Sequence, residues 1–373
     1  MNWQIPPPYP VPEVRPLRWS TWWRVFSLAC IVALMLGFGS YFWLKNGRIL
    51  LYTFITLVAL CLFCSAVAGW MLFRFGVANE HAAGITRYNQ RQEEVWQCWA
   101  QTGIPLLSKS FVLPVDIPMS EPLSPALVNS HAFSPGDYPG HRVLLFELLV
   151  PLLISLQTFL RQHSLVVYLP PLVPARDFFQ VWQDLGLPAS VVLSVEKTPT
   201  QCFTMLYHWA EDSENRAGRL LIFSDWQGHA QHTQGAVAWL LGPNDYQGEL
   251  PVICTLHRPL PTTDEHFISA VQQFLHYQPV AQSATDLWLD NATQPYIAEL
   301  LVQRAASLPT NTSPLLQHYL PHWLGKTGEG SAWLAVTLIM QRVETQRATQ
   351  MLLLKESNEL MFSSISAGAC SYD

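Results

Sequence analysis

The chain has 373 residues, of which half are apolar and 13% are charged, a high apolar content for a wholly water-soluble protein. Its charge is unevenly divided: residues 1–75 carry six Lys or Arg and one acid (net +5), whereas residues 76–373 carry 15 basic and 26 acidic residues (net −11). Because an acidic domain repels the phosphate backbone, this balance excludes nucleic acid as an expected partner.

Residues 1–24 are a tail rich in proline, which begins with the sequence MNWQIPPPYPVPEV. Proline-rich segments stay extended and do not bury a core of their own. We therefore expect a disordered, extended tail, and the alternative is a motif for a proline-binding partner.

Two long apolar runs without a charged residue occupy residues 25–44 and 49–73. About 20 apolar residues are enough to cross the hydrocarbon core, so each run predicts a membrane-spanning helix. The loop between them, residues 45–48, is so short that the two spans must form an antiparallel hairpin. A long first run followed at once by a second argues against a cleaved signal peptide. Tryptophans gather at the ends of the runs, where indole rings favour the membrane interface: Trp19, Trp22, Trp23, Trp43 and Trp70.

The basic residues around the two spans predict their orientation. Three precede the first span, three follow the second and two lie in the loop: Arg15, Arg18, Arg24, Arg74, Arg87, Arg91, Lys45 and Arg48. Since cytoplasmic flanks carry the excess of Lys and Arg, we expect both termini and the soluble part to be cytoplasmic. The expected partner of this segment is the lipid bilayer.

Residues 74–141 are interpreted as a juxtamembrane helix followed by a proline-rich connector. The helix is predicted over residues 80–99 and a strand over residues 106–115. A long loop, with the turn-like sequence SPGDYPG at residues 134–140, completes the connector.

From residue 142 to residue 373 the pattern alternates between helices and strands. Short β-rich runs predict strands at 165–169, 191–195, 220–224, 236–241, 252–256 and 286–289. Helices are predicted at 145–162, 175–185, 203–212, 265–277, 295–307 and 331–343. A hairpin of residues 349–354 and 359–364 closes the chain. The predicted fold class is α/β: an N-terminal transmembrane helical hairpin followed by a layered α/β domain.

The seven cysteines do not predict a metal site or a disulfide framework. Cys61 and Cys64 have C-x-x-C spacing but lie in an apolar run, and no such pair falls in the soluble part. The stretch at residues 225–232 places an acid and two histidines in one loop, and we interpret it as a polar loop rather than a metal site. No P-loop, dinucleotide fingerprint or G-x-S-x-G motif is present, so we expect no cofactor.

Four stretches resemble the thiolase-like fold of the β-ketoacyl synthases. TQCF at residues 200–203 precedes a helix, as the family's nucleophilic cysteine does, and QGAVAWLL at 234–241 resembles its Gly-Ala-rich strand. DLWLDNAT at 286–293 resembles the strand before the family's first catalytic histidine. LGKTGEGSA at 324–332 resembles the Gly-rich turn that holds the second histidine. The resemblance covers about half of the chain and implies a thiolase-like domain behind the anchor.

This resemblance implies Cys202 as a nucleophile, with Asp290 or Asn291 and Lys326 standing at the two histidine positions. An aspartate would oppose the negative charge that develops on a carbonyl oxygen. A thiol at a helix N-terminus can have a lowered pKa, but an isolated cysteine is more commonly a buried core residue. We therefore predict a non-catalytic interaction or assembly protein. The alternative is an acyl-transfer or condensing enzyme that uses Cys202, with Asn291 and Lys326 as donors.

A second resemblance concerns the whole chain. A two-helix anchor, a Trp-rich helix with the sequence VWQCWAQTGIPLL and a degenerate thiolase-like domain resemble accessory inner-membrane proteins of bacterial type VI secretion clusters. The resemblance implies a two-span protein of the bacterial inner membrane. Its expected partners are other envelope or secretion proteins. His318 and His322 flank a Leu-Pro pair and are expected to line the same cleft as Lys326.

Overall fold

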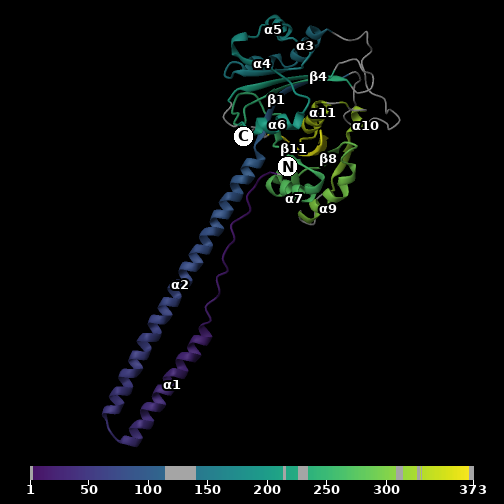
Figure 1. Cartoon of the computed structure of the whole chain (residues 1–373). Helices are drawn as coiled ribbons and strands as arrows, with labels where there is room; N and C mark the ends of the chain where they lie inside the picture. Colours follow the sequence, from purple (N-terminus) through teal and green to yellow (C-terminus); the bar gives the residue numbers. More distant parts are fainter. Residues whose placement is uncertain are drawn as a thin grey trace. The chain divides into compact units, whose positions relative to one another are not determined.

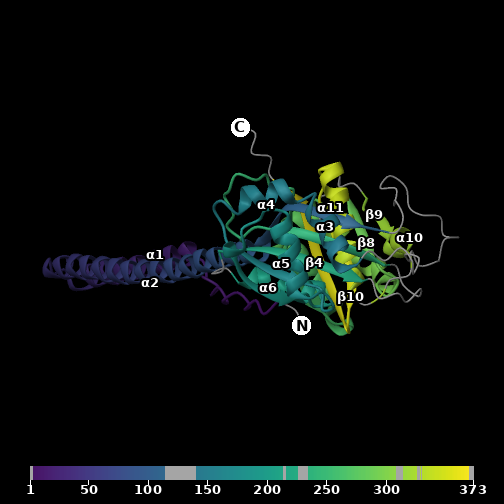
Figure 2. The same ribbon diagram turned by 90° about the horizontal axis from the view of Figure 1, so that it is seen from above.

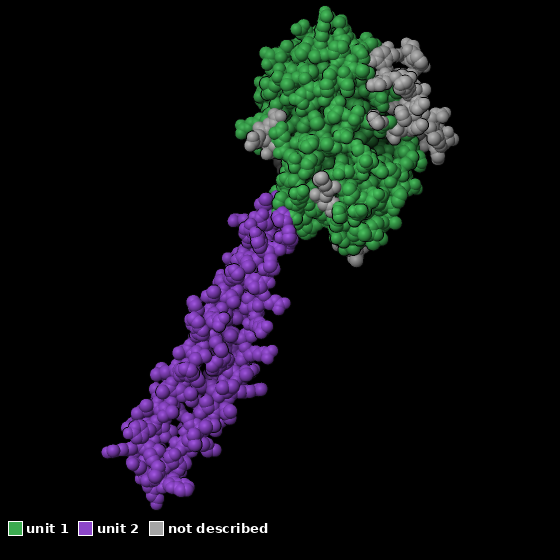
Figure 3. All heavy atoms as spheres, viewed as in Figure 1, with its two compact units in different colours: residues 1–5, 96–373 green, residues 6–95 purple. Residues whose placement is uncertain are grey.

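The computed structural model describes residues 3–113, 140–212, 216–225, 234–307, 314–325, 328 and 330–368. The chain forms two compact units (Figure 3). We call residues 6–95 the hairpin unit, and residues 1–5 with 96–373 the sheet unit. The predicted loop before residue 140, the histidine-containing stretch after residue 225 and Lys326 lie outside the described residues.

Two helices make up most of the hairpin unit: α1 (Trp19–Leu44) and the first part of α2 (Arg48–Gln101), both labelled in Figure 1. Both are long and apolar enough to cross a membrane, which bears out the two predicted spans by length and composition. Lys45 ends α1 in the left-handed conformation, with φ 47°. Because no proline occurs between residues 48 and 101, the second span and the helix predicted at 80–99 are one continuous helix.

The sheet unit contains one mixed sheet with the strand order β3-β2-β4-β5-β1-β6-β11-β10-β8-β9, while β7 pairs with β11. The strands of its N-terminal half are β1 (Gly103–Val112), β2 (Leu165–Leu169), β3 (Val192–Lys197), β4 (Gly218–Asp225) and β5 (Gly235–Leu241). Those of its C-terminal half are β6 (Cys254–His257), β7 (Leu260–Thr262), β8 (Asp286–Leu289), β9 (Leu316–Tyr319), β10 (Gln350–Glu356) and β11 (Glu359–Ala367). Several of them can be followed across the domain in Figure 2.

The two halves of the sheet repeat one strand arrangement. In the N-terminal half, β2 is parallel to β3 and to β4, and β5 lies antiparallel between β4 and β1. In the C-terminal half, β8 is parallel to β9 and to β10, and β11 lies antiparallel between β10 and β6. β1 and β6 pair antiparallel where the halves meet. The layered α/β domain is therefore a duplicated unit, and the predicted fold class is confirmed.

Helices cover both faces of this sheet. They are α3 (His141–Leu149), α4 (Leu153–Phe159), α5 (Ala175–Asp184), α6 (Cys202–Glu211), α7 (Phe267–Tyr277), α8 (Pro279–Gln282), α9 (Ile297–Ser307), α10 (Leu320–Leu324) and α11 (Ser331–Gln346). Short 3₁₀ turns lie at Ala189–Val191, Asp264–His266 and Gln294–Tyr296.

Alternate residues of the central strands face different cores, as the period-2 pleat requires. On β5, Trp239 belongs to the core cluster that contains α6 and α11, whereas Ala238 belongs to the cluster of α3, α4 and α5. On β10, Leu352 joins the same α6–α11 cluster, and Leu353 joins the cluster of α7 and α9. Helices α6 and α11 are therefore packed against strands of both halves, and this shared layer positions Cys202.

The predicted elements differ from the structure at a few points. The helix predicted at 145–162 is two helices, α3 and α4, bent by 70° at a break that contains Pro151. Two strands were not predicted, because β7 is only three residues long and contains Pro261, and β9 lacks an apolar alternation. The closing hairpin is confirmed as β10 and β11, which meet at a turn where Ser357 has φ 56°.

Candidate functional site

The N-terminus of α6 meets the end of β10. Cys202 is the first residue of α6 and is fully buried, with an exposed fraction of 0%. The residue before it, Gln201, provides no side-chain cap. Instead the Glu356 carboxylate, from the last residue of β10, accepts hydrogen bonds from the backbone N–H groups of Phe203 (3.0 Å) and Thr204 (2.9 Å). A carboxylate distant in sequence thus satisfies the unpaired N–H groups of the helix end.

This arrangement works against a reactive thiol. Burial raises the pKa of the Cys202 thiol well above its ordinary value, and the nearby Glu356 carboxylate raises it further. A helix N-terminus lowers the pKa of a thiol when its N–H groups face the sulfur, but here two of them bond to Glu356. Because the thiolate and not the thiol is the nucleophile, Cys202 is held in its unreactive form at neutral pH.

The loop after β8 reaches the same end of β10. The Asp290 carboxylate accepts from the backbone N–H of Lys355 (2.7 Å) and from that of Thr293 (2.8 Å). Asn291, next to it, is exposed to solvent. Asp290 bonds to Lys355 and the start of α6 bonds to Glu356, which are consecutive residues of β10. The structure thus brings together the loop after β8 and the segment around Cys202. Asp290 serves there as a structural acceptor.

The Gly-rich turn before α11 also reaches this edge. Gly330 has φ +81°, and a Cβ at this position would lie 2.7 Å from the Phe223 ring, so only glycine fits without a shift. Three residues further on, the Trp333 indole N–H donates to the Pro199 carbonyl (2.9 Å), just before the segment that leads to Cys202. Since β8 and β10 are parallel, this is the carboxyl edge of that part of the sheet, where α/β proteins commonly bind ligands. The position of the Lys326 side chain lies outside the described residues.

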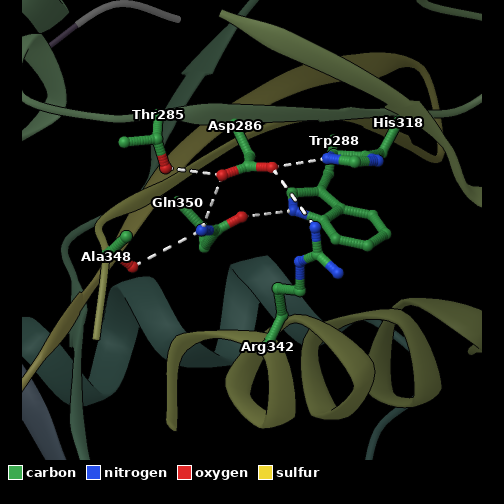
Figure 4. Close-up of polar contacts among 7 residues, drawn as sticks. All are labelled: Thr285, Asp286, Trp288, His318, Arg342, Ala348 and Gln350. Carbon is green, nitrogen blue, oxygen red and sulfur yellow. Dashed lines mark hydrogen bonds and ion pairs between the residues drawn. The ribbon is translucent and has the colours of Figure 1, made fainter. Parts of the chain in front are cut away.

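A second polar cluster lies at the opposite, amino ends of β8 and β10 (Figure 4). Asp286, the first residue of β8, is 2% exposed, and it forms a hydrogen-bonded pair with the His318 ring on β9 (Nε2–Oδ1 2.5 Å). The side chain of Gln350 donates to its other carboxylate oxygen (3.1 Å), and the Thr285 hydroxyl donates to the same oxygen. Arg342 from α11 lies 4.0 Å away.

The surrounding rings hold this network in place. The His318 ring stacks on Trp288, with 4.6 Å between centroids, and the Trp288 indole N–H donates to the Gln350 side-chain oxygen (2.8 Å). Burial by itself raises the pKa of Asp286, but hydrogen bonds from His318, Thr285 and Gln350 outweigh it, and the pKa lies below its usual value. Asp286 is therefore a buried, ionised carboxylate with saturated hydrogen bonding.

The sequence patterns pointed to Cys202 and to the loop after β8, but not to Glu356, Asp286 or Gln350. The polar residue at the start of the apolar run DLWL was a signal for a buried acceptor at a strand end. His318 bonds to Asp286, whereas His322 contacts the Tyr319 ring at 5.7 Å. Among the described residues, no three His, Cys, Asp or Glu side chains are grouped so as to hold a metal ion.

Comparison with protein-family models finds no match to this sequence, and comparison with curated proteins finds none. Among solved structures, the chain is similar to the 3-oxoacyl-(acyl carrier protein) synthase III of Aquifex aeolicus VF5, at 10% identity and a TM-score of 0.42 over 71% of this chain and 100% of that one. It is similar to an oxazolomycin ketosynthase domain of Streptomyces albus JA3453, at 12% identity and a TM-score of 0.45 over 71% of this chain and 95% of that one. It is also similar to the synthase III of Pseudomonas aeruginosa PAO1, at 17% identity and a TM-score of 0.39 over 71% of this chain and 98% of that one. These structures have thiolase-like folds, and a likeness of this size assigns no activity or residue role to this chain.

Proposed function

We propose that this protein is a non-catalytic, membrane-anchored interaction or assembly protein built on an α/β domain of thiolase-like layout. One observation carries the proposal. The backbone N–H groups at the start of α6, beside the buried Cys202, bond to the Glu356 carboxylate. In this arrangement the chain's own negative charge occupies a position where acyl-transfer chemistry needs donors for a negative oxygen.

The magnitude of the effect supports this choice. Removing a single oxyanion donor costs an enzyme about 3 kcal/mol, or about a hundredfold in rate. Here Asp290, which the resemblance puts at one of the two histidine positions, accepts a hydrogen bond from the Lys355 backbone N–H, and Glu356 accepts from the start of α6. A thiol of raised pKa adds to the barrier, because little thiolate forms at neutral pH.

A direct test of this proposal is acylation of the purified full-length protein by acyl thioesters, followed by mass spectrometry of each cysteine. We expect Cys202 to stay unmodified. Cys98 is exposed in the same chain and reports the chemical reactivity of the reagent. Stoichiometric acyl transfer to Cys202, lost in Cys202→Ala, would replace this proposal by a condensing or acyl-transfer enzyme, which the position of Cys202 at a helix start favours.

The proposed location is the bacterial inner membrane, with two spans and a cytoplasmic sheet unit. The support is the excess of basic residues outside the short loop of the hairpin, three on each flank against two within it. A reporter that is active only in the cytoplasm, fused after Asp373, is expected to be active. Activity of a periplasm-specific reporter at the same position would reverse the orientation.

The proposed partners are envelope proteins, with an accessory role in a type VI secretion system as the specific form. This form rests on the resemblance of the anchor, the Trp-rich helix and the degenerate domain to such accessory proteins. Affinity purification of the full-length protein from detergent-solubilised membranes tests it. We expect components of a secretion machine to be recovered. If only other envelope proteins are recovered, the type VI form of the proposal is wrong and the role as an envelope interaction protein remains.

A further inference from the structure

The third residue of the chain, Trp3, is a buried aromatic residue of the sheet unit. Trp3 is 4% exposed, although it lies at the start of a tail with no regular secondary structure. Its indole N–H donates to the Pro259 carbonyl (3.2 Å), and its own carbonyl accepts from the Gln273 side chain (2.9 Å). Its ring meets Trp99 edge-on at 5.6 Å and Phe274 at 6.3 Å. Trp3 therefore has hydrogen-bond partners for its indole N–H and its carbonyl, and aromatic partners for its ring, as a residue in a specific docking site does.

The slot that receives Trp3 is built from well-anchored groups. The Arg258 guanidinium lies 4.0 Å from the centre of the Trp99 ring, with a side chain that is 2% exposed, and donates to the Ala210 carbonyl (2.7 Å). The buried Gln278 amide donates to the carbonyls of both Ala100 and Arg258. The last turn of α2 and the loop after β6 are thus fixed to each other before Trp3 docks. A preformed aromatic slot of this kind binds an indole with little ordering cost.

Further along the tail, a second contact lies within the hairpin unit. The Tyr9 ring meets the Tyr88 ring of α2 at 5.5 Å. The Asn89 side chain accepts from the Tyr9 backbone N–H (3.1 Å) and donates to the Tyr9 carbonyl (2.8 Å). An amide that pairs with both backbone groups of one residue recognises an extended chain, whatever its side chain. The prolines at positions 6, 7 and 8 favour an extended conformation for the part of the tail between the contacts of Trp3 and Tyr9.

We propose that residues 3–9 are a strap by which the chain docks its own N-terminus, with Trp3 as the anchor in a slot of the sheet unit and Tyr9 as a second contact on α2. The occupant of the slot is the chain's own tail. A protein that binds the proline-rich segment must compete with this strap.

Hydroxyl-radical footprinting of the full-length protein in detergent, read by mass spectrometry at each residue, tests the strap. After correction for intrinsic reactivity, we expect Trp3 to be oxidised about tenfold more slowly than Tyr9, because their exposed fractions are 4% and 62%. Equal oxidation of Trp3 and Tyr9 would mean that the tail is unattached, and would overturn the proposal.

Variants sharpen the same measurement. Trp3→Ala is expected to raise the oxidation of Trp99 severalfold, since the slot is emptied. The matched control is Trp19→Ala, which removes the same residue type at a 42% exposed position and should leave Trp99 unchanged. Gln273→Ala should increase the oxidation of Trp3 itself. If Trp99 responds equally to Trp3→Ala and Trp19→Ala, the slot is not the site of Trp3.

Discussion

Two buried carboxylates on neighbouring parts of one half-sheet have opposite surroundings. Glu356, at the end of β10, accepts mainly from the backbone of a helix, whereas Asp286, at the start of β8, accepts from the side chains of His318, Thr285 and Gln350. The first lies at the carboxyl edge of the parallel strands and the second at the amino edge. A carboxylate beside a cysteine or a histidine can therefore be wholly occupied in holding the fold together.

Asp286→Ala is expected to have the largest effect on stability, a loss of about 3–5 kcal/mol in the free energy of unfolding. The substitution leaves the buried Gln350 and the half-buried His318 without their shared acceptor. Chemical unfolding of the full-length protein in detergent measures the loss. The exposed Asp184→Ala is the control and should change stability by less than about 0.5 kcal/mol. A loss below 1 kcal/mol for Asp286→Ala would mean that the network contributes little.

Glu356→Ala should follow with a loss of about 2–3 kcal/mol, because two backbone N–H groups at a helix N-terminus lose a charged acceptor. Lys355→Ala is the matched control: the residue is exposed, and only its backbone N–H bonds to Asp290. The same unfolding measurement compares the two. Equal stability of both variants would show that water caps α6 as well as Glu356 does.

The pH dependence of stability separates the two carboxylates further. The pKa of Asp286 lies below its usual value, so its contribution is present above the unfolded-state pKa of about 3.9 and is lost as pH falls through the folded-state pKa. We expect the stability gap between the wild type and Asp286→Asn to be constant near neutral pH and to narrow below about pH 4. A gap that widens as pH falls would contradict the lowered pKa.

The smallest effect on stability, about 1 kcal/mol, is expected for Cys202→Ala, which removes one small buried side chain. The informative measurement on this residue is thiol alkylation at pH 8 in the folded protein. Cys98 should react at least about a hundredfold faster than Cys202, which is buried and has a raised pKa. Cys254 is a second buried thiol, with its pKa raised to about 12 by burial, and should be as unreactive as Cys202. Fast labelling of Cys202 alone would indicate a poised thiolate.

Much of the fold followed from local patterns in the sequence. The apolar runs at residues 25–44 and 49–73 gave two spans because helix length and hydrophobic thickness are matched locally. The β-rich runs found β2, β5, β8 and the closing hairpin, since strand formation depends on neighbouring residues. Alternation of helices and strands was enough to predict the α/β class. The break of α3 and α4 at Pro151 was readable too, and the prediction of one helix there was wrong.

What the tertiary structure decided rests on contacts between residues far apart in the chain. The Glu356 carboxylate accepts from the backbone N–H of Phe203, which lies 153 positions earlier in the chain. The Trp3 indole donates to the Pro259 carbonyl, which lies 256 positions later. The repeated strand order of the two halves brings β10 beside β8, and with it Asp286 beside Gln350. Helix and strand patterns have periods of a few residues and contain no record of such distant partners. Local patterns are therefore enough to predict an anchor and a class of domain, whereas the charges of the candidate site depend on how the sheet is packed.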